Sequence, residues 1–575
     1  MTSTQADRDR DRARLNDERH ANDWSFAPAF ETIAERMPAH RAIVHGDRVV
    51  SWAEFDAHAE AVAADMRAAG LSHQGKVAVW TRNRPEYLES CYAAFKGRFV
   101  PFNCNYRYGR DEMRYVLDNG DAEAVVLESA FLETATAIRD DLPEVRRWYV
   151  VGDSAAASAN KAADEHVLPP WATDFGSVAR RTVGTSERSL VRHSDDLLLL
   201  YTGGTTGMPK GVMWRQGDLV NILGRGGNRP LGIEPAKSFE HFVDRLDATG
   251  PGPAMLVATP LMHGTGQFSA LQTLMTAGTV VLLTSASLDV AELWQAAADN
   301  RVSSMVVVGQ TFGDPMLRHL REHFDRYDLS ALRLITSSGV MWSEENKAGF
   351  LELLPEVTIF DNYGSSEAVG VGGSVSQKGA TAKDARFRLG ARSAVFTEDG
   401  RRVEPGSAEQ GLLAVTGFIP LGYYKDDEKT QRTFRTFEGR RWSIPGDWAE
   451  VESDGTVRLL GRGSSCINSG GEKIFPEEIE EVLKRHTMVR DAAVVGVPDA
   501  KFGEAVCALV EPRPGAGVGF EQDLPAFVRQ SVASFKVPRH VVVVDTLDRG
   551  ANGKLDHARL KQIALAHVVP TDAHS

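Results

Sequence analysis

The sequence contains few cysteines and no long apolar run, and these two shortages exclude several classes of protein. Apolar runs such as 197–200 and 541–544 fall far short of the roughly 18 apolar residues that a membrane-spanning helix requires. The cysteines form no C-x-x-C pair, so we predict neither a zinc site nor a disulfide framework, and we expect a reducing, cytoplasmic location. The cysteines are four: Cys91, Cys104, Cys466 and Cys507.

The sequence also lacks an excess of positive charge and an apolar segment near its start. The formal net charge is -13 at pH 7, so the protein as a whole repels nucleic acid and anionic membranes. We therefore expect no nucleic-acid partner and no integral membrane segment. Residues 1–22 alternate acidic and basic side chains without an apolar face, which predicts a disordered tail and argues against a secretory signal.

What is present is the composition of an ordinary globular protein, with 42% hydrophobic and 25% charged residues. A chain of 575 residues is longer than one hydrophobic core usually organises, so we expect at least two domains. Between residues 51 and 128, and again between 280 and 364, short apolar runs typical of strands alternate with amphipathic segments typical of helices. This alternation predicts a largely parallel, layered α/β architecture.

A change of composition marks the expected domain boundary. Residues 461–471 are rich in Gly and Ser, and the following PEEIEEVLKRH has an early Pro, acids first and bases last, as a new helix should. We predict a large N-terminal domain of several subdomains over 23–462 and a small α+β domain over 463–575. The stretches 154–164 and 223–254 lack periodicity and are expected to be surface loops.

The segment LLLLYTGGTTGMPKGVMW, residues 197–214, carries the strongest chemical signal. An apolar strand runs into a Gly/Thr loop and returns as a second apolar run. Glycines let backbone N–H groups approach phosphate oxygens, threonine hydroxyls add donors, and Lys210 adds positive charge. The segment contains no G-x-x-x-x-G-K-[ST] motif, so a Walker A site is not implied. A simple Gly-rich hairpin turn is the alternative interpretation.

This segment resembles the adenylate-forming superfamily, whose signature reads YTSGTTGxPKG. Here it spans Tyr201–Gly211, with Gly203 where serine is usual. The resemblance implies that the loop holds the β- and γ-phosphates of ATP with Lys210 nearby, and that Thr206 also assists catalysis and Mg²⁺ binding. The implied loop residues are Thr202, Gly203, Gly204, Thr205, Thr206 and Gly207.

Two further segments resemble the acid and nucleotide sites of that superfamily. In TPLMHGTG, His263 is expected to orient the carboxylic acid, although a structural histidine is an equally good interpretation. In SSGVMW and DNYGSSEAVG, Tyr363 is expected to stack on adenine and Glu367 to bind Mg²⁺, the role of a hard carboxylate oxygen; a polar loop at a strand end is the alternative. The other implied nucleotide-binding residues are Ser338, Gly339, Asn362, Gly364, Ser365 and Ser366.

Three later segments complete the resemblance, which spans about residues 24–560. Asp447 is expected to accept hydrogen bonds from the ribose hydroxyls, with Arg462 supporting the ribose or phosphate side. Gly470 and Gly471 are expected to lie beside the pantetheine arm of coenzyme A, and Lys554, in DRGANGKLD, to reach the carboxylate and the α-phosphate. A turn-capping Asp, solvated glycines and a solvated Lys are the alternatives. The sequence departs from the family at Ser464, where hinge residues are commonly Asp or Lys.

The resemblance implies an AMP-forming acyl-CoA synthetase with an α/β fold and a small mobile C-terminal domain. It would use ATP, Mg²⁺ and coenzyme A, and the acid is expected to be an apolar fatty acid or a steroid side-chain acid. Two alternatives stay open: an enzyme that passes the adenylate to another acceptor or oxidises it, and a non-catalytic nucleotide-binding scaffold. The sequence leaves open whether the protein forms a homo-oligomer.

Overall fold

The computed structural model describes residues 24–152, 168–184, 192–204, 207–339, 342–382, 386–462, 467–469, 472–499, 503–517, 519–532, 534–550 and 555–568. The chain forms two compact units. The first comprises Met1–Gly203, Met208–Asp384 and Thr416–Ser443, and the second comprises Gly204–Gly207, Ala385–Val415 and Ile444–Ser575. The boundary predicted between residues 462 and 463 stays a prediction, and the predicted tail over 1–22 lies outside the described residues. The mixed α/β fold class predicted from the alternation of elements is confirmed.

One sheet of the first unit carries the hairpin predicted to hold phosphate. Its order is β19-β9-β8-β4-β3-β5-β6-β7, and the strands from β8 to β7 are parallel where their register is given. The strands are β19 (Gly422–Tyr423), β9 (Gly207–Arg215), β8 (Leu197–Gly204), β4 (Val100–Asn103), β3 (Lys76–Trp80), β5 (Ala122–Glu128), β6 (Arg147–Val151) and β7 (Ala172–Asp174).

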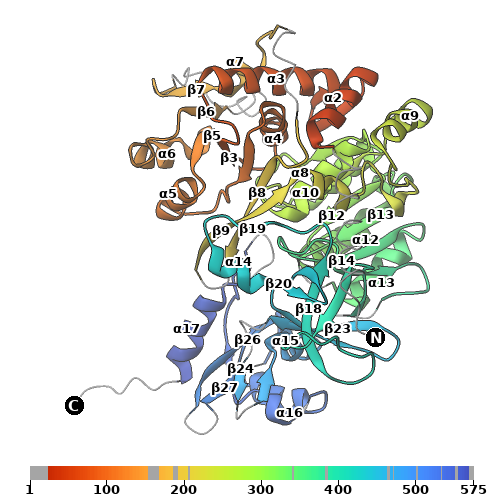
Figure 1. Cartoon of the computed structure of the whole chain (residues 1–575). Helices are drawn as coiled ribbons and strands as arrows, with labels where there is room; N and C mark the ends of the chain where they lie inside the picture. Colours follow the sequence, from red (N-terminus) through yellow and green to blue (C-terminus); the bar gives the residue numbers. More distant parts are fainter. Residues whose placement is uncertain are drawn as a thin grey trace. The chain divides into compact units, whose positions relative to one another are not determined.

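Helices cover both faces of this sheet, as a parallel sheet requires. The helices α3 (Trp52–Ala68), α4 (Pro85–Gly97) and α7 (Phe175–Ala179) pack on one face, and α5 (Arg110–Asn119) and α6 (Leu132–Ile138) pack on the other (Figure 1). The helix predicted from Ser51 begins with a capping box between Ser51 and Glu54. It ends before Gly70, whose φ of 80° is the left-handed conformation that glycine tolerates best.

The second sheet of the first unit is parallel from β1 to β14 and has antiparallel strands, β2 and β15, at its two ends in this unit. The runs predicted as strands between residues 280 and 364 are confirmed. In spatial order the strands are β2 (Arg48–Ser51), β1 (Arg41–His45), β11 (Val280–Leu282), β10 (Met255–Val257), β12 (Ser304–Val307), β13 (Leu334–Ser337), β14 (Thr358–Tyr363) and β15 (Gly372–Ser376).

The remaining elements of the first unit surround these sheets and include the short antiparallel pair of β20 (Phe434–Phe437) and β21 (Arg440–Ser443). The helices are α2 (Phe26–Arg36), α8 (Gln216–Ile222), α9 (Phe239–Thr249), α10 (Gly264–Met275), α11 (Val290–Asp299), α12 (Gly309–His323), α13 (Glu344–Leu353) and α14 (Asp427–Thr433). The 3-10 helices are η1 (Ser129–Phe131), η2 (Arg139–Asp141), η5 (Arg229–Leu231) and η6 (Phe324–Arg326).

The prediction of a loop over residues 223–254 is wrong for residues 239–249, which form α9. Ser238 caps this helix by accepting a hydrogen bond from the backbone N–H of His241. Phe242 and Leu246 lie four residues apart and are buried, and Trp24 packs edge-on against Phe239 with ring centroids 5.4 Å apart. The periodicity was short, and the nearby Gly and Pro residues concealed it. The other predicted loop, 154–164, lies outside the described residues.

The strands of the second unit form two sheet segments. The first has the order β16-β23-β22-β18, with β17 paired to β18, and the second has the order β25-β24-β27-β26, with β28 paired to β27. The strands are β16 (Arg386–Leu389), β17 (Ser393–Phe396), β18 (Gln410–Thr416), β22 (Asp447–Val451), β23 (Thr456–Arg462), β24 (Ile467–Ser469), β25 (Glu472–Ile474), β26 (Val489–Asp499), β27 (Gly503–Pro512) and β28 (His540–Val543).

The helices α15 (Pro476–Lys484) and α16 (Leu524–Arg529) pack over the second of these sheets around Ile479, Leu483 and Val528, and α17 (His557–Val568) packs against β26. Two 3-10 helices, η8 (Phe520–Gln522) and η9 (Ser534–Lys536), complete the unit. The sequence-based prediction of an α+β arrangement at the C-terminal end is confirmed. Among the described helices of both units, none combines the length and the apolarity that crossing a membrane requires.

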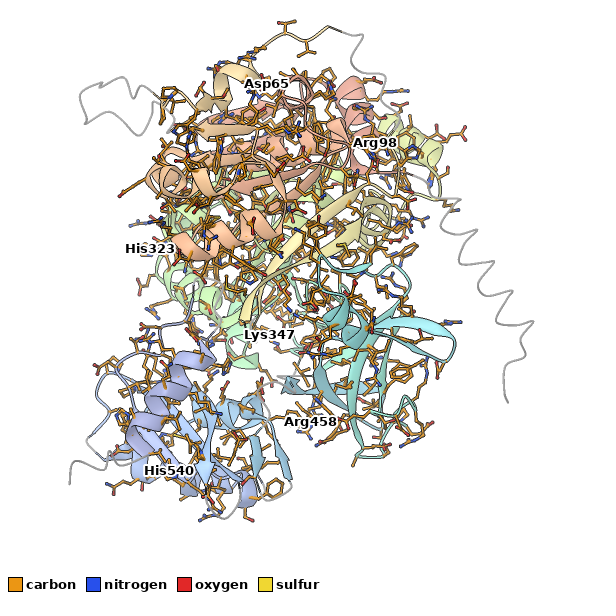
Figure 2. The ribbon with its side chains drawn as sticks, turned by 60° about the vertical axis from the view of Figure 1, so that its left-hand side comes forward. Asp65, Arg98, His323, Lys347, Arg458 and His540 are labelled. Atoms are coloured by element: carbon orange, nitrogen blue, oxygen red, sulfur yellow. The ribbon has the colours of Figure 1, made fainter. Side chains whose placement is uncertain are left out.

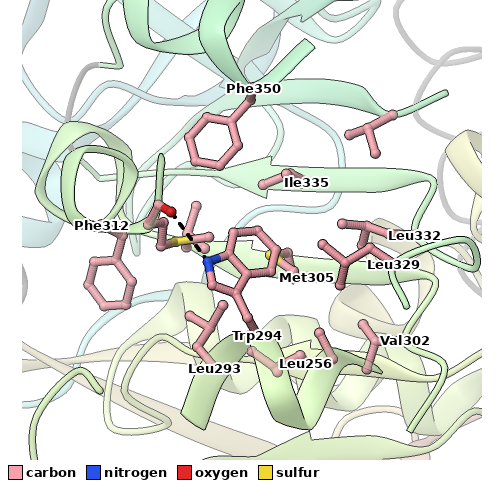
Figure 3. Packing of buried hydrophobic residues seen from close by; sticks show 14 of the residues in the cluster. Leu256, Leu293, Trp294, Val302, Met305, Phe312, Leu329, Leu332, Ile335 and Phe350 are labelled. Atoms are coloured by element: carbon pink, nitrogen blue, oxygen red, sulfur yellow. Dashed lines mark hydrogen bonds between the residues drawn. The ribbon is translucent and has the colours of Figure 1, made fainter. Parts of the chain in front are cut away.

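A large apolar core under the parallel sheet stabilises the first unit. Trp294 is fully buried among Leu293, Met305 and Ile335, and its indole Nε1 donates to the carbonyl oxygen of Met316 at 3.3 Å (Figure 3). Replacing Trp294 by alanine would leave a cavity of the size of an indole, which the neighbouring side chains can fill only in part. We therefore expect Trp294→Ala to lower the free energy of unfolding by about 3–5 kcal/mol.

Differential scanning calorimetry should show the loss as a lower Tm for the transition of this unit. Phe324→Ala is the control, because Phe324 is 37% exposed in the neighbouring η6 and should leave Tm nearly unchanged. Equal Tm values for the two variants would show that the core is not packed as described.

Candidate active site

The Gly/Thr segment forms two neighbouring strands, as its pattern predicts. Thr202, Gly203 and Gly204 end β8, and Gly207 begins β9. Thr205 and Thr206 lie outside the described residues. Gly211 on β9 has a steric role, because a Cβ there would lie 2.9 Å from the Tyr201 ring on β8. The glycine therefore lets the two strands close around that tyrosine.

Lys210 projects from β9 and binds a carboxylate. Its Nζ donates to Oδ2 of Asp426, and this hydrogen bond holds the pKa of Asp426 below its ordinary value. The other oxygen of Asp426, Oδ1, accepts from the backbone N–H of Lys429 at 2.9 Å and caps α14. The lysine predicted to lie near phosphate is thus held on the return strand of the hairpin by a helix-capping aspartate.

The segments predicted to bind adenine lie at the carboxyl ends of two adjacent parallel strands. Ser337 on β13 is in register with Asp361 on β14, so Ser338 and Gly339 leave the sheet beside Asn362 and Tyr363. Gly339 has a φ of 88°, a left-handed conformation that turns the chain away from β13. Ligands of parallel α/β sheets bind outside these carboxyl ends.

An ion pair between a buried lysine and a half-buried aspartate anchors the end of β14. The ammonium of Lys347 on α13 donates to Oδ2 of Asp361 at 2.9 Å, and Lys347 is 1% exposed (Figure 2 labels Lys347). A lysine is buried at this depth only when its charge is compensated. The pair therefore fixes the strand end that carries Asn362 and Tyr363.

Glu367 lies four residues beyond Tyr363 in a tightly held turn. Ser365 and Ala368 exchange backbone hydrogen bonds of 2.9 and 3.1 Å, which brings Gly364, Ser365 and Ser366 into the same turn. The indole Nε1 of Trp214 on β9 donates to the Ser366 carbonyl at 3.0 Å. The strand that carries Lys210 is therefore bonded directly to the segment that carries Glu367.

Two hydroxyl groups hold Glu367 itself. Tyr423 OH donates to Oε1 of Glu367 at 2.7 Å, and Ser443 Oγ donates to its carbonyl oxygen at 2.6 Å. Glu367 is 8% exposed. Its second oxygen, Oε2, accepts no hydrogen bond from the described residues. Oε2 is also not among the fully buried polar atoms of those residues that lack a partner. A carboxylate oxygen held in this way suits a hard divalent cation such as Mg²⁺ as one of its ligands.

His263 is the N-cap residue of α10 and lies in the middle of the predicted acid-binding segment, residues 259–266. Two buried or half-buried amides hold this segment. Asn83 Nδ2 donates to the Thr259 carbonyl at 2.9 Å, and Asn83 Oδ1 accepts from the N–H of Leu261 at 2.7 Å. Asn103 Nδ2 donates to the carbonyl of Met262 at 2.6 Å.

Asn103 also contacts the start of the phosphate hairpin. Its Nδ2 donates to the Tyr201 carbonyl at 2.9 Å, and its Oδ1 accepts from the Tyr201 N–H at 2.6 Å. One amide at the end of β4 therefore ties the Gly/Thr hairpin to the His263 segment. Asn103 is 2% exposed, so the amide can meet its hydrogen-bonding needs only through these contacts.

In the second unit, Asp447 and Arg462 are register partners on the adjacent strands β22 and β23. Asp447 is 4% exposed. The structure thus places together the two residues predicted to hold the ribose side of a nucleotide. Ser464, Gly470, Gly471 and Lys554 lie outside the described residues, so their predicted roles stay predictions.

Sequence patterns alone missed several residues of this arrangement. Three residues from distant parts of the chain contact predicted site residues: Trp214, Tyr423 and Asp426. Asn103 contacts both the start of the Gly/Thr hairpin and the His263 segment. A signal existed for Asn103, since an amide at the end of the apolar run FVPFN has no reason to be buried unless it is bonded. The segment GYYKDD carried no comparable signal.

Two family profiles match the sequence. The profile described as AMP-binding enzyme matches residues 30–424, and the profile described as AMP-binding enzyme C-terminal domain matches residues 478–554. Together they account for most of the chain, and the first alone covers more than half of it.

Similar proteins were found by sequence and by structure. A 3-oxocholest-4-en-26-oate–CoA ligase of Rhodococcus rhodochrous is 38% identical over 543 residues, covering 93% of this chain and 94% of that protein. A medium/long-chain-fatty-acid–CoA/3-oxocholest-4-en-26-oate–CoA ligase of Mycobacterium marinum is 37% identical over 540 residues, covering 94% and 96%. The fold is that of the anthranilate CoA ligase AuaEII in complex with anthranoyl-AMP, with a TM-score of 0.77, 19% identity and coverage of 95% and 99%.

Proposed function

This chain belongs to the AMP-binding enzyme family, and from that membership we propose that it is an ATP-dependent acyl-CoA synthetase. The reaction joins a carboxylic acid to coenzyme A in two steps. ATP, the acid and coenzyme A are the substrates, and AMP, pyrophosphate and the acyl thioester are the products.

The observation that carries the proposal is the hydrogen bond from Trp214 to the Ser366 carbonyl. It fixes β9, the strand that carries Lys210, against the turn that carries Glu367, so a lysine of the kind that binds phosphate and a carboxylate of the kind that binds a divalent cation lie on hydrogen-bonded segments. Enzymes of nucleoside triphosphates need both features, because phosphate charge is stabilised by backbone N–H groups, by lysine and by a divalent cation.

In the first step, a carboxylate oxygen of the acid attacks the α-phosphorus of ATP, and the bond to pyrophosphate breaks. The hairpin holds the leaving pyrophosphate through its backbone N–H groups, and Lys210 stands beside them. Glu367, with Thr206, would hold Mg²⁺, which supplies positive charge against the phosphate oxygens. Lys554 steadies the α-phosphate and the incoming oxygen, and His263 orients the acid.

In the second step, the thiol sulfur of coenzyme A attacks the acyl carbon, its proton is lost to solvent, and AMP leaves. No covalent intermediate with the enzyme is required. We propose that the domain over 463–575 turns at Ser464 between the two steps and brings Gly470 and Gly471 beside the pantetheine arm. Asp447 and Arg462 hold the ribose and phosphate side of the nucleotide, while Ser338, Gly339, Asn362 and Tyr363 hold the adenine.

The proposed acid is apolar: a medium- or long-chain fatty acid or the side-chain acid of a steroid. The Rhodococcus rhodochrous and Mycobacterium marinum ligases, which match over nearly the whole chain, are named for such acids. The predicted acid segment leads into α10, whose buried residues include Phe268, Leu271 and Leu274. A cytoplasmic location and homo-oligomer formation stay predictions.

The experiment is an assay of thioester formation with ATP, Mg²⁺, coenzyme A and a panel of short-, medium- and long-chain fatty acids and steroid side-chain acids. We expect thioester and AMP in equal amounts with at least one apolar acid, measured by chromatography. Acid-dependent exchange of pyrophosphate into ATP without thioester would show that the acceptor is not coenzyme A. No product and no exchange with any acid would favour the non-catalytic scaffold.

A further inference from the structure

We propose that Tyr423 is the positioning residue of the metal-binding carboxylate, Glu367, and that its hydroxyl sets the affinity of the enzyme–ATP complex for the divalent cation. This inference rests on the proposed function and adds a residue to it. The motif that suggested Glu367 spans residues 361–370. Tyr423 lies outside it, 56 residues after Glu367, in the segment GYYKDD.

The hydroxyl of Tyr423 donates to one oxygen of the Glu367 carboxylate and does not contact the other oxygen. Its donation to Oε1 at 2.7 Å takes place inside the protein, because Tyr423 is 2% exposed and Glu367 is 8% exposed. A carboxylate whose Oε1 is held can rotate little, so Oε2 keeps a fixed direction. Glu367 would therefore hold a divalent cation with Oε2, the oxygen that Tyr423 does not engage.

The tyrosine is itself rigidly held. Its backbone N–H donates to Thr430 Oγ1 at 2.9 Å, and the strand β19 that contains it pairs with β9, with Tyr423 opposite Val212. The ammonium of Lys429 lies 4.2 Å from the centroid of the Tyr423 ring. A cation over a phenol ring attracts its π electrons and makes the hydroxyl a stronger donor.

The same short strand links the carboxylate to the phosphate hairpin. Leu421 N–H donates to the Met213 carbonyl at 2.9 Å, and Tyr424 N–H donates to the Gly211 carbonyl at 2.8 Å, so residues 421–424 follow β9. Because β9 also carries Lys210, Tyr423 holds Glu367 in a fixed position relative to that lysine. Glu367 would then hold a divalent cation in a fixed position relative to Lys210.

The test compares Tyr423→Phe with Tyr424→Phe in the full chain. The neighbour is a matched control, because its hydroxyl donates to Asp121 on the surface at 2.7 Å and does not contact Glu367. Mn²⁺ is the probe, titrated into enzyme and ATP without any acid and followed by electron paramagnetic resonance. ATP binding in the presence of EDTA is measured by equilibrium dialysis.

We expect Tyr423→Phe to weaken Mn²⁺ binding by about 10- to 100-fold, the usual effect of removing a group that orients a metal ligand. ATP binding in EDTA should stay within about twofold of wild type, and so should both measurements for Tyr424→Phe. The inference would be overturned if Tyr423→Phe bound Mn²⁺ like wild type. It would also be overturned if the variant lost as much affinity for ATP in EDTA as it lost for Mn²⁺. Circular dichroism checks that each variant is folded.

The Mn²⁺ titration also separates this inference from the proposed function, because it needs no substrate acid. If wild type binds Mn²⁺ with ATP and the phenylalanine variant does not, Tyr423 positions the metal whatever the acceptor of the adenylate. If wild type makes thioester and the variant keeps the wild-type dependence on Mg²⁺, the enzyme is a synthetase but Tyr423 has no such role.

Discussion

Replacing Glu367 by glutamine is expected to lower the rate of adenylation by about 10²- to 10³-fold, because the variant loses the negative charge that would hold Mg²⁺ beside the phosphates. Glutamine keeps the size of the side chain, and its amide oxygen can still accept from Tyr423 OH. The change therefore removes the negative charge without removing the contact that holds the side chain. Acid-dependent exchange of pyrophosphate into ATP measures the step directly.

The matched control for this variant is Glu133→Gln, because Glu133 is exposed on α6 and should leave the exchange rate unchanged. Raising the Mg²⁺ concentration should restore part of the activity of the Glu367 variant, since a weakened site is filled by mass action. A Glu367→Gln enzyme with wild-type exchange at low Mg²⁺ would remove Glu367 from the metal site.

Lys554→Ala is expected to have an effect of similar size, a loss of about 10²- to 10³-fold in adenylation. The proposed role of Lys554 is to offset charge on the α-phosphate and the attacking oxygen, and alanine offers neither charge nor donor. The role belongs to the first step alone. The variant should therefore still convert a synthetic acyl-adenylate and coenzyme A to thioester at nearly the wild-type rate.

The contrast between the two half-reactions is the decisive measurement for Lys554. Lys561→Ala is its control, because Lys561 is a half-exposed residue of α17 that pairs with Glu504 and should leave both steps unchanged. If Lys554→Ala slowed both half-reactions equally, the lysine would support the fold of its domain and would not act on the α-phosphate.

Local patterns in the sequence predicted the elements whose signal is complete within a few residues. The strand β3 appears in KVAVWT, the start of α15 in the Pro and acids of PEEIEE, and the hairpin of β8 and β9 in its Gly/Thr loop. Glu367 lies in a turn after β14, and its role as a metal ligand stays a prediction. In each case, backbone geometry is dictated by residues close in sequence.

The contacts that hold the site could not be predicted in the same way. Asn103 meets Met262 across 159 positions, and Trp214 meets Ser366 across 152. No periodicity links residues so far apart, because these pairs form only after both sheets are in place. The helix α9 was missed for a different reason: its apolar face, with Phe242 and Leu246, is only two turns long.

The parallel pairing of β1 with β11 has a consequence for the synthesis of the protein. Ile43 is in register with Val280, so β1 leaves the ribosome about 240 residues before its partner. At roughly 5–20 residues per second, roughly 10–50 s pass before the two strands can meet. During that interval β1 can pair only with β2, and its other edge is open to wrong partners. Nascent chains should therefore bind chaperones until β11 has left the ribosome.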